Sequence, residues 1–189
     1  MTSASNVPFF PPIKTRTHEV CGAGAYLFAF ALAARCGGPV LWIREAWDKQ
    51  QINPVGFAGF VNPSEVRVCI TETQLDTLAI AEESLRSKAV SLVVMALNKP
   101  IGLTEGRRLQ LAAQAGESTG LAIIPDGMGS NAAQTRWRCS PIFDADQRSQ
   151  DSTLQSWELI KNKSGTLGAW HVLWDAASHR IVMVSPSGK

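Results

Sequence analysis

The hydrophobic pattern begins with a short strand that runs through a glycine-rich turn into an apolar helix. Residues 18–22, "HEVCG", predict the strand, and residues 25–34 predict the helix. The helix is apolar nearly all round, so we expect it to be buried. Gly37, Gly38 and Pro39 end it, and residues 40–43 predict a second strand.

A third strand and an amphipathic helix follow. Residues 66–70, "VRVCI", predict the strand. The next stretch, "TETQLDTLAIAEESLR", begins with a capping-box pattern formed by Thr71 and Gln74. Three leucines recur at helical spacing, and the expected buried face carries Leu75, Leu78 and Leu85.

Two continuous apolar runs predict strands deep in a parallel sheet. They are residues 89–97, "AVSLVVMAL", and residues 120–125, "GLAIIP". A helix containing "GRRLQLAAQAG" lies between them and is expected to end near Gly116. This alternation of strands and helices indicates an α/β fold with a mostly parallel central sheet flanked by helices.

The last part of the chain carries strand patterns with few helical signals. Alternation in "QTRWRCS" places Arg136 and Arg138 on the face opposite Trp137. "AWHVLWD" alternates in the same way, with Trp170 and Trp174 on one face. These strands predict an antiparallel C-terminal extension of the sheet.

The remaining segments set the domain boundaries. Residues 1–17 are polar and rich in proline, and they predict an irregular leader. Residues 144–153, "DADQRSQDST", predict a polar loop. Residues 18–189 predict a single domain, long enough to bury a sizeable core.

The apolar stretch at residues 20–34 also has features of a targeting signal. Lys14 and Arg16 precede it, and "ALAA" near its end is similar to a cleavage site. It is too short to cross a bilayer, which takes about 20 apolar residues. Cleavage would also discard the strand at 18–22, so we expect neither export nor membrane contact.

Composition narrows the function. Apolar residues make up 45% of the chain and charged residues 18%, which excludes wholesale disorder. The net charge of +2 is too small to indicate a general nucleic-acid binder, so any binding surface must be local. The four cysteines and three histidines show no paired spacing. We therefore expect reduced thiols, no metal site and a cytoplasmic location.

The turn after the first strand lies where a nucleotide-binding protein carries its phosphate loop. That loop needs G-x-x-x-x-G-K-[ST], because the lysine contacts phosphate and the hydroxyl holds Mg²⁺. Counted from Gly22, the second glycine, lysine and hydroxyl positions hold Leu27, Phe28 and Ala29, and counting from Gly24 gives no better match. We therefore expect a degenerate phosphate loop, no bound cofactor and no catalytic residue.

The order of the motifs resembles a known family. The segments are "HEVCGAGA…LAAR", "GPVLWIRE", "GRRLQLAAQAGESTGLAIIP", "TRWRCSP" and "ELIKNKSG…GAWHVLWD". Over roughly residues 18–185 they resemble the ImuA family of bacterial RecA-like, SulA-related proteins. The resemblance implies a RecA-like core and a role in the SOS mutagenic response, at the nucleoid after DNA damage. Its implied partners are ImuB and an error-prone C-family DNA polymerase in translesion synthesis, with RecA and weak DNA contact as further candidates.

The resemblance also places two further nucleotide motifs. "SLVVMAL" matches the Walker B strand, yet its end offers Met95, Ala96 and Leu97 where an aspartate should hold Mg²⁺. Glu45 stands where a RecA-like enzyme keeps its water-activating glutamate. With no ligands for metal or phosphate, we interpret Glu45 as a retained surface or cap residue. The resemblance then implies a degenerate ATPase fold that is not an enzyme.

RecA-like proteins reach DNA through two loops, which match residues 98–108 and 126–136 here. Lysine and arginine supply the phosphate-binding part of such contacts, although they are also ordinary solvated side chains. The candidate DNA or partner contacts are Lys99, Arg107, Arg108, Arg136, Arg138, Lys161 and Lys163. Trp42 or Trp47, near a strand end, is a candidate for a protein interface.

Two alternatives stay open beside a non-catalytic adaptor. One is a divergent RecA-like ATPase with non-standard ligands, for which Lys99 is a candidate cation. The other is a SulA-like cell division inhibitor that binds the tubulin-like division protein.

Overall fold

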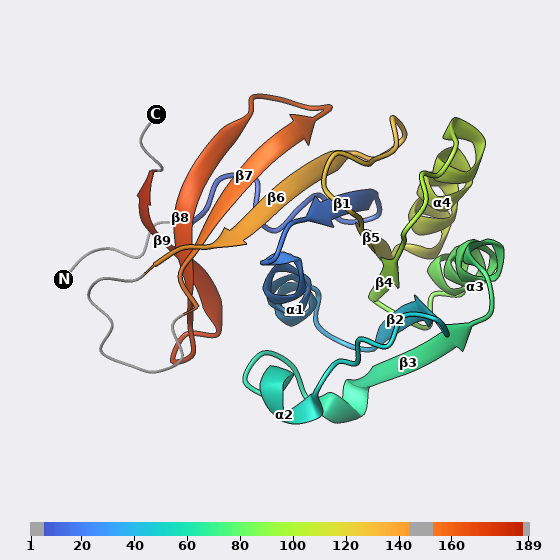
Figure 1. The fold of residues 1–189 in the computed structure, drawn as a ribbon, viewed down its shortest axis with the longest axis horizontal. Helices are drawn as coiled ribbons and strands as arrows, with labels where there is room; N and C mark the ends of the chain where they lie inside the picture. Colours follow the sequence, from blue (N-terminus) through green and yellow to red (C-terminus); the bar gives the residue numbers. More distant parts are fainter. Residues whose placement is uncertain (1–5, 144–152, 187–189) are drawn as a thin grey trace.

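The computed structural model describes residues 6–143 and 153–186, in which nine strands form a single sheet (Figure 1). The sheet order is β3-β2-β4-β5-β1-β6-β7-β8-β9. The strands are β1 (Thr17–Cys21), β2 (Val40–Glu45), β3 (Val66–Thr71), β4 (Leu92–Ala96), β5 (Thr119–Ile123), β6 (Thr135–Pro141), β7 (Gln155–Asn162), β8 (Gly168–Asp175) and β9 (Arg180–Pro186). The helices are α1 (Ala25–Cys36), α2 (Pro54–Phe57), α3 (Gln74–Arg86), α4 (Leu103–Gly116) and the 3₁₀ helix η1 (Pro63–Glu65).

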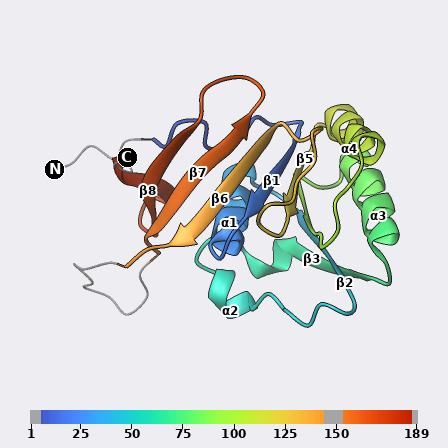
Figure 2. The ribbon, with the colours of Figure 1, turned by 45° about the horizontal axis from the view of Figure 1, so that its top comes forward.

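The sheet is parallel from β3 to β6 and antiparallel beyond. β1 lies between β5 and β6 and is parallel to both. The pairs β2–β3, β2–β4 and β4–β5 are also parallel. From β6 to β9 each strand is antiparallel to the next, and Figure 2 shows β6, β7 and β8 side by side beyond β1. The predicted α/β class, with a mostly parallel sheet flanked by helices, is confirmed.

Successive strand residues point to two separate cores. Val94 faces a core rich in aromatic side chains around α1, whereas Val93 faces a second core under α3 and α4. α3 and α4 lie side by side in both views (Figures 1 and 2). The apolar α1 is largely buried, as its composition predicted.

The leader packs on the core around α1. Residues 6–16 contain no helix or strand, as expected, and β1 starts one residue earlier than predicted. Val7 is buried, and the Phe10 ring centroid lies 5.5 Å from that of Phe28 and 5.0 Å from that of Trp157. Val7 and Phe10 of the leader are therefore part of the hydrophobic core.

The start of α3 differs from the prediction. The capping box is formed by Thr73 and Asp76, because β3 continues through Thr71. Each of the two capping side chains accepts a hydrogen bond from the backbone N–H of the other residue. Leu75, in the first turn of α3, is 74% exposed, so its predicted burial is wrong. The buried face consists of Thr77, Ala81, Glu82 and Leu85.

Other boundaries also shift. β2 continues to Glu45, and β4 begins only at Leu92. The unpredicted α2 and η1 each follow an asparagine whose side chain caps the first turn, with proline at the first helical position. The predicted polar loop at 144–153 lies outside the described residues, apart from Thr153. No described helix has the length and apolar character needed to cross a bilayer.

Candidate functional site

The phosphate-loop position is a tight turn, Gly22–Gly24, between β1 and α1. Gly22 has φ +89°, and a Cβ atom there would collide with the carbonyl oxygen of Cys139 on β6. The Gly24 N–H donates to the same carbonyl at 2.8 Å. The two glycines therefore allow close packing against β6, and one of the amides that would cradle a phosphate is already bonded.

The residues at the predicted phosphate-loop positions are packing residues. Phe28 is fully buried, with ring centroids of Phe10, Trp137 and Trp157 at 5.5, 5.4 and 4.8 Å. Ala29 is fully buried, and Leu27 is half-buried against the same core. The Gln155 side chain lies directly against Gly24, leaving no room for a methyl group there.

The carboxyl ends of β2, β4 and β5 surround a crevice of about 360 Å³, lined by Tyr26, Glu45, Trp47, Asp48, Asn98 and neighbouring residues. Glu45 is only 5% exposed and accepts a hydrogen bond from Asn98 Nδ2 at 3.2 Å, so its interpretation as a surface residue is wrong. Lys99 does not line this crevice. Its position therefore gives no support to its role as a replacement cation.

The two candidate interface tryptophans separate in the structure. Trp42 is buried in the aromatic core, whereas Trp47 is 57% exposed at the rim of the crevice. Trp42 is therefore excluded from a surface contact, and Trp47 remains a candidate.

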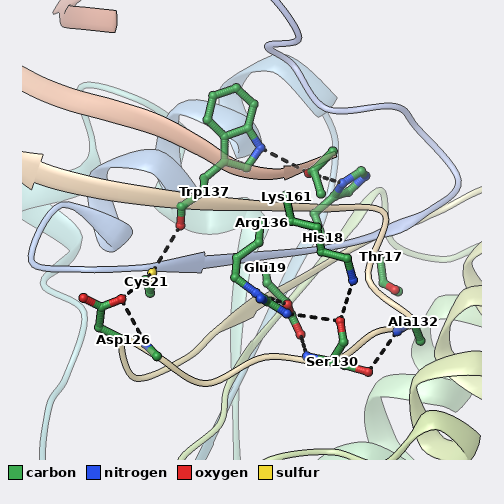
Figure 3. Close-up of polar contacts among 12 residues, drawn as sticks. Thr17, His18, Glu19, Cys21, Asp126, Ser130, Ala132, Arg136, Trp137 and Lys161 are labelled. Atoms are coloured by element: carbon green, nitrogen blue, oxygen red, sulfur yellow. Dashed lines mark hydrogen bonds and ion pairs between the residues drawn. The ribbon is translucent and has the colours of Figure 1, made fainter. Parts of the chain in front are cut away.

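A partly buried ion pair joins β1 and β6 (Figure 3). Arg136 Nε lies 2.8 Å from Glu19 Oε2, and the other carboxylate oxygen accepts the Ser130 N–H at 2.7 Å. Arg136 and Lys161 also donate to the Ser130 carbonyl, at 3.2 and 2.7 Å. Burial, and then the charge of Arg136, lower the pKa of the Lys161 ammonium. Arg136 and Lys161, both predicted as DNA or partner contacts, therefore hold the connection between β5 and β6 in place.

Sequence reasoning missed Glu19 as the partner of Arg136. Its signal was a carboxylate inside a short central strand, where a charge must be paired.

Arg138 and Arg108 are also held by carboxylates. Arg138 contacts Asp126 at 3.0 Å and Glu158 at 3.4 Å. The Arg138 guanidinium lowers the pKa of the Asp126 carboxyl, and Asp126 raises the pKa of Arg138. Arg108 contacts Glu82 of α3 at 2.7 Å. Both arginines carry charges that are matched within the chain.

A chain of buried hydrogen bonds runs beside the ion pair of Glu19 and Arg136 (Figure 3). Trp137 Nε1 donates to Thr135 Oγ1 at 3.1 Å, and Thr135 Oγ1 lies 2.8 Å from His18 Nδ1. His18 Nε2 lies 2.8 Å from the Ile13 carbonyl, which fits a neutral ring with its proton on Nε2. Burial is the main cause that lowers the pKa of His18 to about 4, and Arg16 adds to it.

Arg107 and Lys163 line a groove beside α4, which we call the α4 groove. It is bounded by Leu103, Arg107 and Leu111 on α4 and by Arg16, Asn131 and Lys163 opposite. Lys99 is exposed and lies outside it. The seven predicted contacts therefore do not form one basic surface, and the structure brings only Arg107 and Lys163 together in a cavity.

The cysteines and histidines gather no metal site among the described residues, and the four thiols are free. Burial raises the pKa of Cys21 and of Cys36 to about 11, with Asp126 adding to the effect at Cys21. In comparisons with known proteins, no family model and no curated protein matches the chain.

Proposed function

We propose that the protein is a RecA-like adaptor of the ImuA type in the bacterial SOS mutagenic response. It acts in the cytoplasm and supports ImuB and an error-prone C-family DNA polymerase during translesion synthesis. The phosphate-loop position carries the proposal, because Phe28, at the position of the lysine, is packed into the aromatic core and Gln155 lies directly against Gly24. A core of this kind, without the residues of nucleotide chemistry, is suited to work through binding partners.

The topology supports the RecA-like part of the proposal. β1 leads into the glycine turn from the middle of the sheet, between β5 and β6. The neighbouring strand β2 ends at Glu45, and Asn98 lies just after the end of β4; their side chains meet at 3.2 Å. An antiparallel region then closes the sheet, in the order that the sequence resemblance implies.

The residue types support an adaptor over a nucleotide hydrolase. The Phe28 ring is buried against Trp137 and Trp157, so the lysine position offers no cation to a phosphate. The next position holds Ala29 and offers no hydroxyl for Mg²⁺. A nucleotide would therefore find neither of these two ligands in the loop.

A nucleotide titration tests the non-catalytic part of this proposal. We expect isothermal calorimetry to detect no saturable binding of ATP in the presence of Mg²⁺. Tight Mg²⁺-dependent binding, with turnover abolished by Glu45→Gln, would overturn the proposal in favour of a divergent ATPase.

Recovery of partners tests the adaptor role. Tagged protein isolated from its host after DNA damage should bring ImuB with it, whereas tagged protein from undamaged cells sets the background. Filamentous cells on overproduction, without ImuB recovery or any effect on mutagenesis, would contradict the adaptor role and favour a division inhibitor.

A further inference from the structure

The α4 groove is a preformed cavity of about 500 Å³. One wall is a face of α4, where Leu103, Arg107 and Leu111 follow each other at helical spacing. The opposite wall combines Arg16, before β1, with residues 131, 132 and 134 before β6 and Lys163 after β7. Segments far apart in sequence therefore meet at this cavity.

Hydrogen bonds fix the groove without a ligand. Gln110 accepts the Thr17 N–H at 3.1 Å and donates to the Thr17 and Ala132 carbonyls, both at 3.0 Å. Lys163 Nζ donates to the Ala132 carbonyl at 2.8 Å. The walls are ordered by the fold itself, so a ligand that enters loses little free energy to ordering them.

The groove carries positive charge that is not matched by carboxylates. Arg16, Arg107 and Lys163 line it, and no acidic residue of the described chain does. None of the three forms an ion pair with another described residue. Arg108, the next residue after Arg107, is instead paired with Glu82. The unmatched charge favours an anionic ligand.

Apolar surface lies beside these charges. Leu103 and Leu111, one turn of α4 before and after Arg107, are 48% and 65% exposed. Apolar contacts combined with ion pairs are typical of peptide docking. Single-stranded nucleic acid instead uses aromatic side chains for base stacking, and no described aromatic residue lines the groove. The lining therefore favours an acidic peptide over nucleic acid.

We propose that the α4 groove docks an acidic segment of a partner protein. Carboxylates of that segment contact Arg16, Arg107 and Lys163, and an aliphatic side chain packs on Leu103 and Leu111. The inference rests on the proposed function only in requiring a protein partner. The shape and charge of the groove do not depend on that partner's identity.

Fluorescence anisotropy on the full chain tests the groove. The probe is a short fluorescein-labelled peptide of alternating glutamate and leucine, and a lysine–leucine peptide of the same length is its control. We expect the acidic peptide alone to bind, and to bind more weakly as salt is added. Arg107→Ala should weaken binding about threefold to tenfold, because it removes a charge-assisted contact.

Arg108→Ala is the matched control, because it removes the same charge from the next residue of α4, outside the groove lining. Its affinity should stay within about twofold of wild type. Leu111→Ser, at an exposed site where folding is not at risk, should also weaken binding. Equal affinity in wild type, Arg107→Ala and Leu111→Ser would overturn the proposal. So would equal losses in Arg107→Ala and Arg108→Ala.

A thymidine oligonucleotide provides the competing arm. Oligonucleotide binding that depends on Arg107 and exceeds peptide binding would overturn the proposal in favour of a nucleic-acid site. Groove-dependent peptide binding without recovery of ImuB after damage supports the groove and counts against the proposed function. Recovery of ImuB without peptide binding supports the proposed function and counts against the groove, so the two proposals fail separately.

Discussion

Phe28→Ala should strongly destabilise the fold. The ring is fully buried and has three aromatic neighbours with centroids 4.8–5.5 Å away. Removing a buried phenylalanine ring costs about 3–5 kcal/mol, through lost transfer free energy and the cavity left behind. For a chain of this length, that corresponds to a fall in Tm of roughly 6–20 °C.

The assay is urea unfolding followed by tryptophan fluorescence, since Trp137 and Trp157 contact the ring and report on the same core. Phe9→Ala is the matched control, because Phe9 is 45% exposed with one ring neighbour, Trp170, at 6.4 Å. We expect the control to lose less than about 1.5 kcal/mol. A similar loss in both variants would refute the conclusion that a packing residue fills the phosphate-loop position. Magnesium-dependent ATP binding gained by Phe28→Ala would refute our conclusion that the remaining site lacks phosphate ligands.

Three further predictions concern the residues around β1. Glu19→Gln should cost about 3 kcal/mol in the free energy of unfolding, because it leaves Arg136 without its buried carboxylate. Glu158→Gln, which removes a solvent-exposed partner of Arg138, should cost less than about 1 kcal/mol, and equal losses in urea unfolding would contradict this ranking. The pKa of His18 is lowered from 6.5 to about 4, so the unfolded chain binds a proton that the folded chain excludes, and stability falls as pH drops through this window. Between about pH 7 and pH 5 the free energy of unfolding should fall by about 2 kcal/mol through His18 alone. In His18→Gln the fall over the same range should be smaller by that amount. An unchanged pH dependence in this variant would refute the lowered pKa of His18. The thiols of Cys21 and Cys139 should react with a disulfide reagent far more slowly in the folded chain than in urea, because burial raises the pKa of both. Fast reaction of all four thiols in the native protein would contradict this prediction.

The sequence located most elements but not all their limits. Alternating and continuous apolar runs identified the strands, because these patterns report directly on which faces are buried. The predicted capping box at Thr71 and Gln74 is wrong, because the same segment contains a second pair at capping-box spacing, Thr73 and Asp76. The choice between them depends on how far β3 pairs with β2, which runs through Glu45↔Thr71. Local pattern alone cannot supply that pairing.

Seven cations looked alike in the sequence, and tertiary contacts gave them different roles. Arg107 and Arg108 are adjacent, but successive helix residues point about 100° apart. One therefore faces the α4 groove and the other meets Glu82 of α3. Arg136 is tied to Glu19, which lies 117 positions away along the chain.

The sequence by itself determined the strand and helix alternation and the absence of a phosphate-loop lysine and hydroxyl at Phe28 and Ala29. Both follow from residue type and short spacing, which are local properties. Only the tertiary structure decided that Phe28 packs among aromatic side chains, that Glu19 neutralises Arg136, and that Arg16, Arg107 and Lys163 share a cavity. Those outcomes depend on which strands become neighbours, and pairing between distant segments is set by the packing of the whole chain.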